Sequence, residues 1–245
     1  MKKTILHISQ DYPDSIKKEK TPAIYNLVTS SHQFKHLVLS LNRSSVPQKN
    51  KIIIKDNLIE IKYFRPPFGL FINLALLKLS RDIEKILRSA NIHFDVIHAH
   101  KLTIEGVVAN YLSRKFNKPY VSTVRGLSDL YILRYKPFSK FVYANILANS
   151  SKLFFLAPWC EQTIKEKFLN IVIDKKSILL PNIVFGSEVA SQKNMIISNR
   201  FITSARFNAV NYKSKNLLRT IRAFEKASKN LNEIYLDIFL TGENR

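Results

Sequence analysis

Phe94-Asp-Val-Ile-His-Ala-His100 is a short apolar strand that runs into polar residues. Tyr120-Val-Ser-Thr-Val-Arg-Gly126 repeats this pattern one predicted helix later. Short apolar runs that are separated by helices are typical of buried parallel strands. Ligands of open α/β sheets bind beyond the carboxyl ends of such strands. We therefore expect His98, His100, Thr123 and Arg125 to lie around one crevice.

Strands and helices alternate from residue 4 to residue 180. Helices are predicted from Thr21-Pro22 and over residues 68–91, 103–116 and 158–169, with helical sequence also through residue 149. Strands are predicted over residues 4–9, 36–41, 95–99, 120–124, 152–157 and 177–180, and residues 51–54 and 58–64 form a predicted hairpin. This order predicts an α/β fold, a Rossmann-like parallel sheet with helices on both faces.

The alternation stops and then restarts. We predict an N-terminal Rossmann-like domain over residues 1–184, a linker over 185–199, and an incomplete second domain over 200–245. The last segment holds a strand (200–205), a helix (216–227) and a strand (234–240), which is the first βαβ unit of a second Rossmann-like domain. One such unit is too small to bury both faces of its sheet, so we expect the sequence to be part of a longer chain.

The chain of 245 residues is strongly basic, with 39 Lys and Arg against 18 Asp and Glu and a formal net charge of +21. This charge favours an anionic partner: nucleic acid, an acidic membrane surface or a phosphorylated small molecule. No zinc-finger, RNA-binding or helix-turn-helix signal accompanies it, so nucleic acid is not expected. The single Cys160 indicates a reducing compartment, and the first apolar run is too short for a signal peptide. A cytoplasmic protein is predicted.

Two histidines, His98 and His100, lie two residues apart on one predicted strand, so their side chains share a face. Such a pair can bind a metal, but a third ligand at suitable spacing is not apparent, and no metal site is predicted. We expect His98 to pack near the strand end. We expect His100 to face the crevice, where a neutral imidazole can hydrogen-bond a sugar hydroxyl or a phosphate.

Cationic residues follow two of the predicted strands. Arg125 can bind a phosphate or, alternatively, brace its loop through an ion pair with Asp129. Thr123 can bind a ligand or cap the turn. Arg206 and Lys215 bracket the loop before a predicted helix, where they can form an anion site or simply belong to the charged surface. Glu105 stands near a predicted helix start, where capping is the default role.

Two segments, residues 66–72 and 131–141, mix aromatic, aliphatic and cationic residues. This composition is typical of a contact with an anionic membrane surface. Packing of a helix against the core explains the apolar residues equally well. Both interpretations stay open at this point.

The ordered set of motifs resembles the bacterial GT-B glycosyltransferases of the retaining, nucleotide-sugar-dependent family 4 type. The motifs are Ile5-Leu-His-Ile-Ser9 with Tyr12-Pro13, Asp95-Val-Ile-His-Ala-His100, Thr123-Val-Arg-Gly126 with Asp129, Leu180-Pro-Asn182, and Ser204-Ala-Arg-Phe207 with Lys215-Asn216 and Ala223-Phe224. They span nearly the whole chain in the family's order.

The resemblance implies two Rossmann-like domains that face each other across a cleft. It implies that Arg206 and Lys215 clasp the diphosphate of the donor, and that His100, Thr123, Arg125 and Asp129 line the acceptor side. A nucleotide sugar would be the donor substrate, without a cofactor or metal. The acceptor would be a cell-surface polysaccharide or a lipid-linked precursor on the inner face of the membrane.

The chain departs from the family pattern at several positions. Residues 17–23 contain no glycine where the family has a Gly-Gly pair, Arg125 stands where many members have His, and Ile183 replaces a usual glycine. The glutamates that hold the donor sugar would lie beyond residue 245. We therefore expect the 245-residue chain to be inactive or severely impaired. The alternative is a non-catalytic remnant, an anion-binding module at the membrane surface.

Overall fold

The structure is a computed structural model, and it describes residues 2–17, 20–69, 71–135, 139–171, 173–183, 199–206, 216–229 and 233–241. The chain divides into two compact units, Met1–Phe185 and Gly186–Arg245. The expected linker, residues 185–199, lies almost wholly outside the described residues. Each unit is therefore considered by itself.

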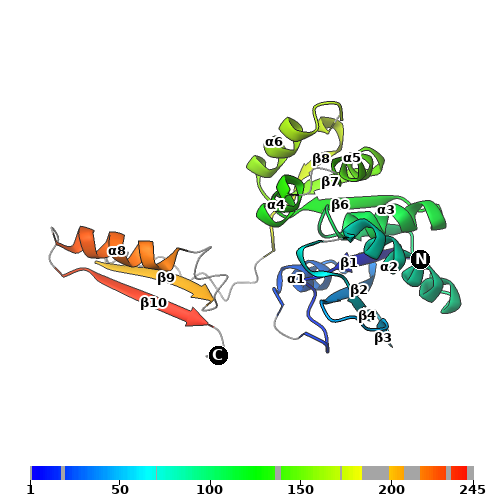
Figure 1. Cartoon of the computed structure of the whole chain (residues 1–245), viewed down its shortest axis with the longest axis horizontal. Helices are drawn as coiled ribbons and strands as arrows, with labels where there is room; N and C mark the ends of the chain where they lie inside the picture. The colour runs from blue at the N-terminus through cyan, green and yellow to red at the C-terminus, as the bar shows by residue number, and fades with distance from the viewer. Residues whose placement is uncertain are drawn as a thin grey trace. The chain divides into compact units, whose positions relative to one another are not determined.

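The first unit is built on an eight-stranded sheet with the strand order β3-β4-β2-β1-β5-β6-β7-β8 (Figure 1). Neighbouring strands are parallel except for the β3–β4 hairpin. The strands are β1 (Thr4–Ser9), β2 (Lys35–Ser44), β3 (Lys51–Lys55), β4 (Leu58–Phe64), β5 (Val96–Ala99), β6 (Tyr120–Val124), β7 (Lys152–Phe155) and β8 (Ser177–Leu179). The predicted α/β fold and the predicted hairpin are confirmed.

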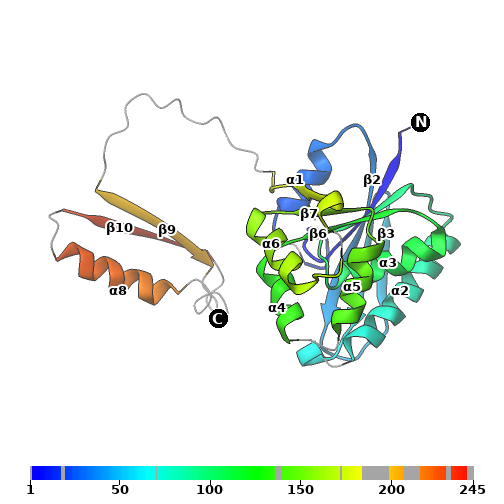
Figure 2. The same ribbon diagram turned by 90° about the horizontal axis from the view of Figure 1, so that it is seen from above.

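The connecting helices cover both faces of this sheet, as Figure 2 shows for α1 on one side and α2 and α3 on the other. They are α1 (Ala23–Ser30), α2 (Ile72–Ser89), α3 (Glu105–Phe116), α4 (Leu127–Tyr135), α5 (Lys140–Asn149) and α6 (Pro158–Lys167), with short 3-10 turns η1 (Pro67–Gly69) and η3 (Asp174–Lys176). No helix in the described ranges is long and apolar enough to cross a membrane.

One face of the sheet carries the apolar core. Alternate residues of the strands point to it, and the apolar stripes of α2, α3 and α5 pack on them. Its fully buried members include Leu6, Ile8, Leu39, Ile59, Ile61, Ile97, Leu76, Leu79, Ile83, Val108, Leu112, Ile146, Leu153 and Phe155. The opposite face, under α1, is unusually polar, because the intervening positions of β1, β2 and β5 hold His7, Ser9, Ser40 and His98, and His100 follows β5 directly.

Two helix predictions need correction. The helix expected from residue 68 begins only at Ile72, because Phe68 and Phe71 adopt left-handed backbone angles (φ 54° and 49°) that no helix tolerates. The helix predicted from Thr21-Pro22 begins only at Ala23, and Pro22 occupies its N-cap position.

The second unit is a βαβ unit, as predicted. Strand β9 (Arg200–Arg206) pairs in parallel with β10 (Tyr235–Thr241), and α8 (Leu217–Ser228) connects them. Leu217 is buried, and the rings of Phe201 and Phe224 meet edge to face, so α8 packs on this small sheet.

Candidate functional site

The strand order reverses between β1 and β5. From β1 the chain adds β2 and β4 on one side, and from β5 it adds β6, β7 and β8 on the other. In open α/β sheets the ligand crevice lies at this switch point, beyond the carboxyl ends of the strands. Here those ends are Ser9 of β1, Ala99 of β5 and Val124 of β6.

Four histidines lie on the polar face next to this point. His7 of β1 stands directly beside His98 of β5 in the strand register, and His36 of β2 and His100, just after β5, lie next to His7. The rings of His98 and His100 are only 4.0 Å apart between centroids. The sequence marks His98 and His100 as candidates but not His7 and His36, whose only signal is their period-two position on neighbouring strands.

Three of these rings are joined by hydrogen bonds. His36 Nε2 lies 2.6 Å from the carbonyl oxygen of Ser31, His36 Nδ1 lies 2.9 Å from His7 Nε2, and His7 Nδ1 lies 2.9 Å from His100 Nε2. His98 Nε2 separately meets the hydroxyl of Thr123 at 2.8 Å. The Thr123 hydroxyl therefore contacts a buried histidine.

The three innermost imidazoles are neutral at pH 7. Burial lowers the pKa of His98 to about 3, with a further contribution from the charge of Arg125. Burial likewise holds the pKa of His7 and His100 well below 6.5, and the nearby His98 adds to the effect on both. Uncharged rings of this kind can offer one donor and one acceptor each.

His100, Thr123 and Arg125 line one small cavity, as the sequence leads us to expect. Its volume is about 20 Å³, room for one water molecule. Helix α1 and the segment after β8 fill the rest of the crevice. The other lining residues are Ala23, Ile24, Leu27, Leu156, Leu180, Pro181, Asn182 and Ile183.

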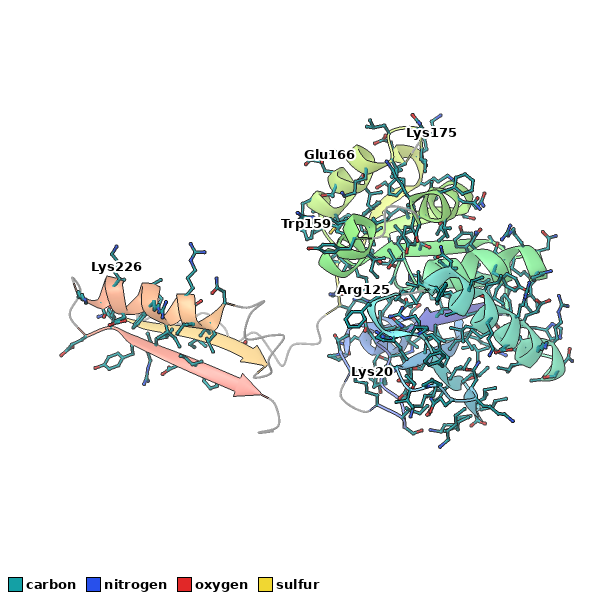
Figure 3. All side chains as sticks on the ribbon, in the orientation of Figure 1. Lys20, Arg125, Trp159, Glu166, Lys175 and Lys226 are labelled. Atoms are coloured by element: carbon teal, nitrogen blue, oxygen red, sulfur yellow. The ribbon has the colours of Figure 1, made fainter. Side chains whose placement is uncertain are left out.

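Arg125 lies just beyond β6, on the side of the first unit where Trp159 of α6 also lies (Figure 3). Its guanidinium donates a hydrogen bond to the side-chain oxygen of Asn182, and Asn26 donates to the carbonyl oxygen of Ile183 at 3.1 Å. These two bonds hold the Leu180–Pro–Asn182 motif over the cavity. Burial lowers the pKa of Arg125, which nevertheless stays a cation.

Asp129 does not line this cavity. Its carboxylate accepts hydrogen bonds from the Arg125 backbone N–H at 2.9 Å, from the Thr103 hydroxyl at 2.8 Å and from the Thr103 backbone N–H at 3.1 Å. It is fully buried, and burial raises its pKa. Asp129 thus braces the loops after β5 and β6, through the backbone of Arg125 and not through the ion pair that we weighed from the sequence.

A second buried carboxyl, Glu105, ties α3 to the end of β1. Its Oε1 accepts a hydrogen bond from the Gln10 backbone N–H at 2.7 Å, and its Oε2 has no partner in the described structure. Burial raises the pKa of Glu105 to about 8, against the opposing charge of Lys101. The default capping role is therefore wrong for this residue.

Asp14 anchors the loop between β1 and α1 on the polar face. Its side chain and that of Lys20 are 0% and 4% exposed and form an ion pair at 2.8 Å. Asn42 donates to the same carboxylate at 2.7 Å, and Ser40 also donates to it. Burial works to raise the pKa of Asp14, but these hydrogen bonds lower it below its ordinary value.

The two residues expected to bind the donor lie in the second unit. Arg206 is the last residue of β9, and Lys215 lies outside the described residues. Helix α8 begins at Leu217, shortly after this loop.

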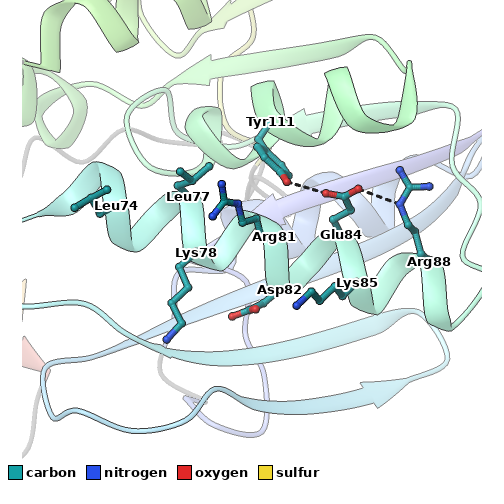
Figure 4. Close-up of a pocket in the computed structure, with 9 residues that line it drawn as sticks. All are labelled: Leu74, Leu77, Lys78, Arg81, Asp82, Glu84, Lys85, Arg88 and Tyr111. Carbon is teal, nitrogen blue, oxygen red and sulfur yellow. Dashed lines mark hydrogen bonds and ion pairs between the residues drawn. The ribbon is translucent and has the colours of Figure 1, made fainter.

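A larger hollow of about 540 Å³ lies on the outer side of α2, next to Tyr111 of α3 (Figure 4). Glu84 occupies its centre and accepts hydrogen bonds from Tyr111 at 2.8 Å and Arg88 at 3.0 Å. No strand of the sheet ends here, and the lining is made of surface side chains. The smaller cavity at the switch point is therefore the better candidate site.

Comparison with known proteins supports the fold assignment. No protein-family model matches the chain, and no curated protein matches it in sequence. Among solved structures, an alpha,alpha-trehalose-phosphate synthase (UDP-forming) from Burkholderia xenovorans in complex with glucose-6-phosphate is 13% identical with a TM-score of 0.64, over 99% of this chain and 66% of that one. A structure named as trehalose-6-phosphate from E. coli bound with UDP-2-fluoro glucose is 10% identical with a TM-score of 0.61, over 98% and 65%.

At such low identity the likeness establishes the fold and nothing finer. The first unit is a GT-B-like N-terminal Rossmann-like domain, and the second holds a small parallel sheet. The chain spans about 65% of the length of the E. coli structure.

Proposed function

We propose that this chain is the acceptor domain and the first part of the donor domain of a retaining GT-B glycosyltransferase of the family 4 type. The enzyme transfers a sugar from a nucleotide sugar to a cell-surface polysaccharide or a lipid-linked acceptor. The observation that carries the proposal is the convergence of His100, Thr123 and Arg125 at the switch point of a GT-B-like sheet. The trehalose-phosphate synthase structures, one named with UDP-2-fluoro glucose and one with glucose-6-phosphate, support the same substrate class.

In this proposal Arg206 and Lys215 bind the diphosphate of the donor. Positive groups near the N-terminus of α8 stabilise the charge that develops on the leaving nucleotide. The acceptor approaches His100, Thr123 and Arg125, with Asp129 holding the Arg125 loop in place. No metal is required, because the cations neutralise the diphosphate.

Equilibrium dialysis with radiolabelled nucleotide sugars tests the donor part. We expect Arg206→Ala to weaken binding about 10- to 100-fold, the effect of one charged hydrogen bond. Arg222→Ala, at an exposed position of α8, is the matched control and should bind like the native chain. Equal affinities of the two variants would argue against the assignment of Arg206.

We further propose that the 245-residue chain binds a donor without efficient turnover. A transfer assay with a membrane extract as acceptor source tests this point. Robust incorporation of label would contradict it, whereas failure to bind any nucleotide sugar would favour the alternative, a non-catalytic anion-binding module.

A specific observation supports contact with an anionic membrane on the cytoplasmic side. Phe71 and Phe141 are 72% and 81% exposed, and the start of α2 lies beside the start of α5, since Asn73 donates to Ser139 at 3.4 Å. The left-handed backbone at Phe71 is a strained conformation for an aromatic residue. Lys140 adds a cation at the same place.

Vesicle flotation tests this surface. We expect the chain to float with vesicles that contain phosphatidylglycerol, and the double variant Phe71→Ser/Phe141→Ser to stay in the pellet fraction. Leu169→Ser, which removes an equally exposed side chain after α6, is the control and should float normally. Flotation of the double variant would remove the membrane surface from the proposal.

A further inference from the structure

Three imidazoles form a continuous hydrogen-bonded chain across β2, β1 and β5. The chain starts at the carbonyl oxygen of Ser31 and passes through His36 and His7 to His100, with N–O and N–N distances of 2.6, 2.9 and 2.9 Å. His7 and His100 are 2% and 1% exposed, so water does not compete for these bonds.

The carbonyl group of Ser31 fixes the donor-to-acceptor direction of this series of hydrogen bonds. A carbonyl oxygen only accepts, so Nε2 of His36 carries a proton. In its neutral form an imidazole has one N–H donor and one acceptor nitrogen, so Nδ1 of a neutral His36 accepts from Nε2 of His7. For the same reason, Nδ1 of His7 accepts from Nε2 of His100.

His100 then has a single remaining nitrogen, Nδ1, with an unshared electron pair. No described residue forms a hydrogen bond with this nitrogen. His100 also lines the small cavity with Thr123 and Arg125. Burial lowers the pKa of His7 and His100, which keeps both of these rings neutral.

A metal site is the competing interpretation of the same histidines. One ligand atom from each of His7, His98 and His100 lies within 4.8 Å of the others. The charge of Arg125 acts on both His98 and His100, however, and this positive potential opposes a second cation. Nδ1 of His7 and Nε2 of His100 are also already paired with each other.

We propose that His7 and His36 are positioning residues that fix His100 in its Nε2–H tautomer, so that the cavity presents an acceptor nitrogen to its ligand. The site then selects a group that donates a hydrogen bond, such as a sugar hydroxyl, over the oxygen of a phosphate or carboxylate. The choice of a sugar rests on the proposed function, but the tautomer does not.

NMR of the whole chain with ¹⁵N-labelled histidine tests the tautomer directly at pH 8, where an ordinary imidazole is neutral. The chain has only 6 histidines, so the ring signals can be assigned by substitution. We expect a ¹⁵N–¹⁵N coupling across the hydrogen bond between His7 Nδ1 and His100 Nε2, with the shared proton on His100. A proton on His7 Nδ1 instead would overturn the inference.

Two substitutions of His36 separate positioning from mere folding. His36→Phe removes the acceptor for His7, so the fraction of His100 with its proton on Nδ1 should rise about tenfold, the effect of one hydrogen bond. His36→Gln keeps a side-chain carbonyl at this position and should preserve the native tautomer if it folds. His32→Phe, at an exposed position, is the control. An unchanged His100 tautomer in folded His36→Phe would overturn the positioning role.

Two additives complete the test. Sulfate has no proton to donate, so the Nε2–H tautomer of His100 should persist in its presence. Zinc chloride should leave the coupling between His7 and His100 intact. Loss of the coupling with one equivalent of zinc would establish the metal site instead, and a sulfate-induced move of the proton to Nδ1 would overturn the stated ligand preference.

Discussion

Glu105 offers a quantitative test of the buried polar edge of the sheet. Its pKa rises from 4.5 to about 8 because the carboxyl is fully buried. The folded protein therefore keeps a proton between about pH 4.5 and pH 8 that the unfolded chain releases. The folded state binds more protons in this window, so the free energy of unfolding falls as the pH rises through it.

The magnitude follows from the size of the shift. Each pH unit corresponds to 1.36 kcal/mol, so the full window gives an upper limit of about 5 kcal/mol. The substitution Glu105→Gln removes the titration and keeps an oxygen for the Gln10 N–H. Between pH 5 and pH 9 the native chain should lose about 2–5 kcal/mol of its free energy of unfolding relative to the variant.

Urea unfolding of both proteins at several pH values measures this difference. Glu166→Gln, at an exposed position of α6, is the matched control, and its free energy of unfolding should change with pH as that of the native chain does. If native protein and Glu105→Gln also run parallel from pH 5 to pH 9, then Glu105 is ionised in the folded state and our account of its burial is wrong.

Three further predictions concern stability, measured by urea unfolding. Asp14→Ala leaves Lys20 buried without its partner and should lower the free energy of unfolding by about 3–5 kcal/mol. The control Glu161→Ala, in the more exposed pair with Lys165, should lower it by less than about 1 kcal/mol. Similar losses in both variants would contradict the anchoring role of Asp14. Because the pKa of Asp14 is held below its ordinary value, its contribution should be complete at neutral pH and be lost as the pH falls through the folded pKa. Gly126→Ala should lower the free energy of unfolding by about 1–2 kcal/mol, because φ is +75° there and the new Cβ would lie 3.3 Å from the Trp159 ring. An unchanged free energy of unfolding would show that the backbone of this turn adapts to the new side chain.

Much of the fold could be predicted because strand and helix periods are local signals. The strand at Thr4–Ser9 and the one at Tyr120–Val124 have the predicted bounds. The start of α2 could not be predicted, since the backbone at Phe68 and Phe71 is set by tertiary context and not by their helical spacing.

The candidate site was only partly predictable, because some of its residues come together through tertiary context and not through a local signal. His100, Thr123 and Arg125 stand at strand ends, which the sequence marks, and the structure brings them to one cavity. His7 and His36 join the site through the order and register of strands distant in sequence. The sequence around Asp129 does not show whether its carboxylate contacts a ligand or holds neighbouring loops in place. Its hydrogen bonds to Thr103 and Arg125 in the structure indicate the second role.

The most direct test of the central claim is isothermal titration of the chain with nucleotide sugars and with the matching nucleoside monophosphates. The account predicts that at least one nucleotide sugar binds about tenfold or more tightly than its monophosphate, because the diphosphate is the group that Arg206 and Lys215 hold. Equal affinity for both ligands, or no binding of any nucleotide sugar, would contradict the assignment of this chain to a nucleotide-sugar glycosyltransferase.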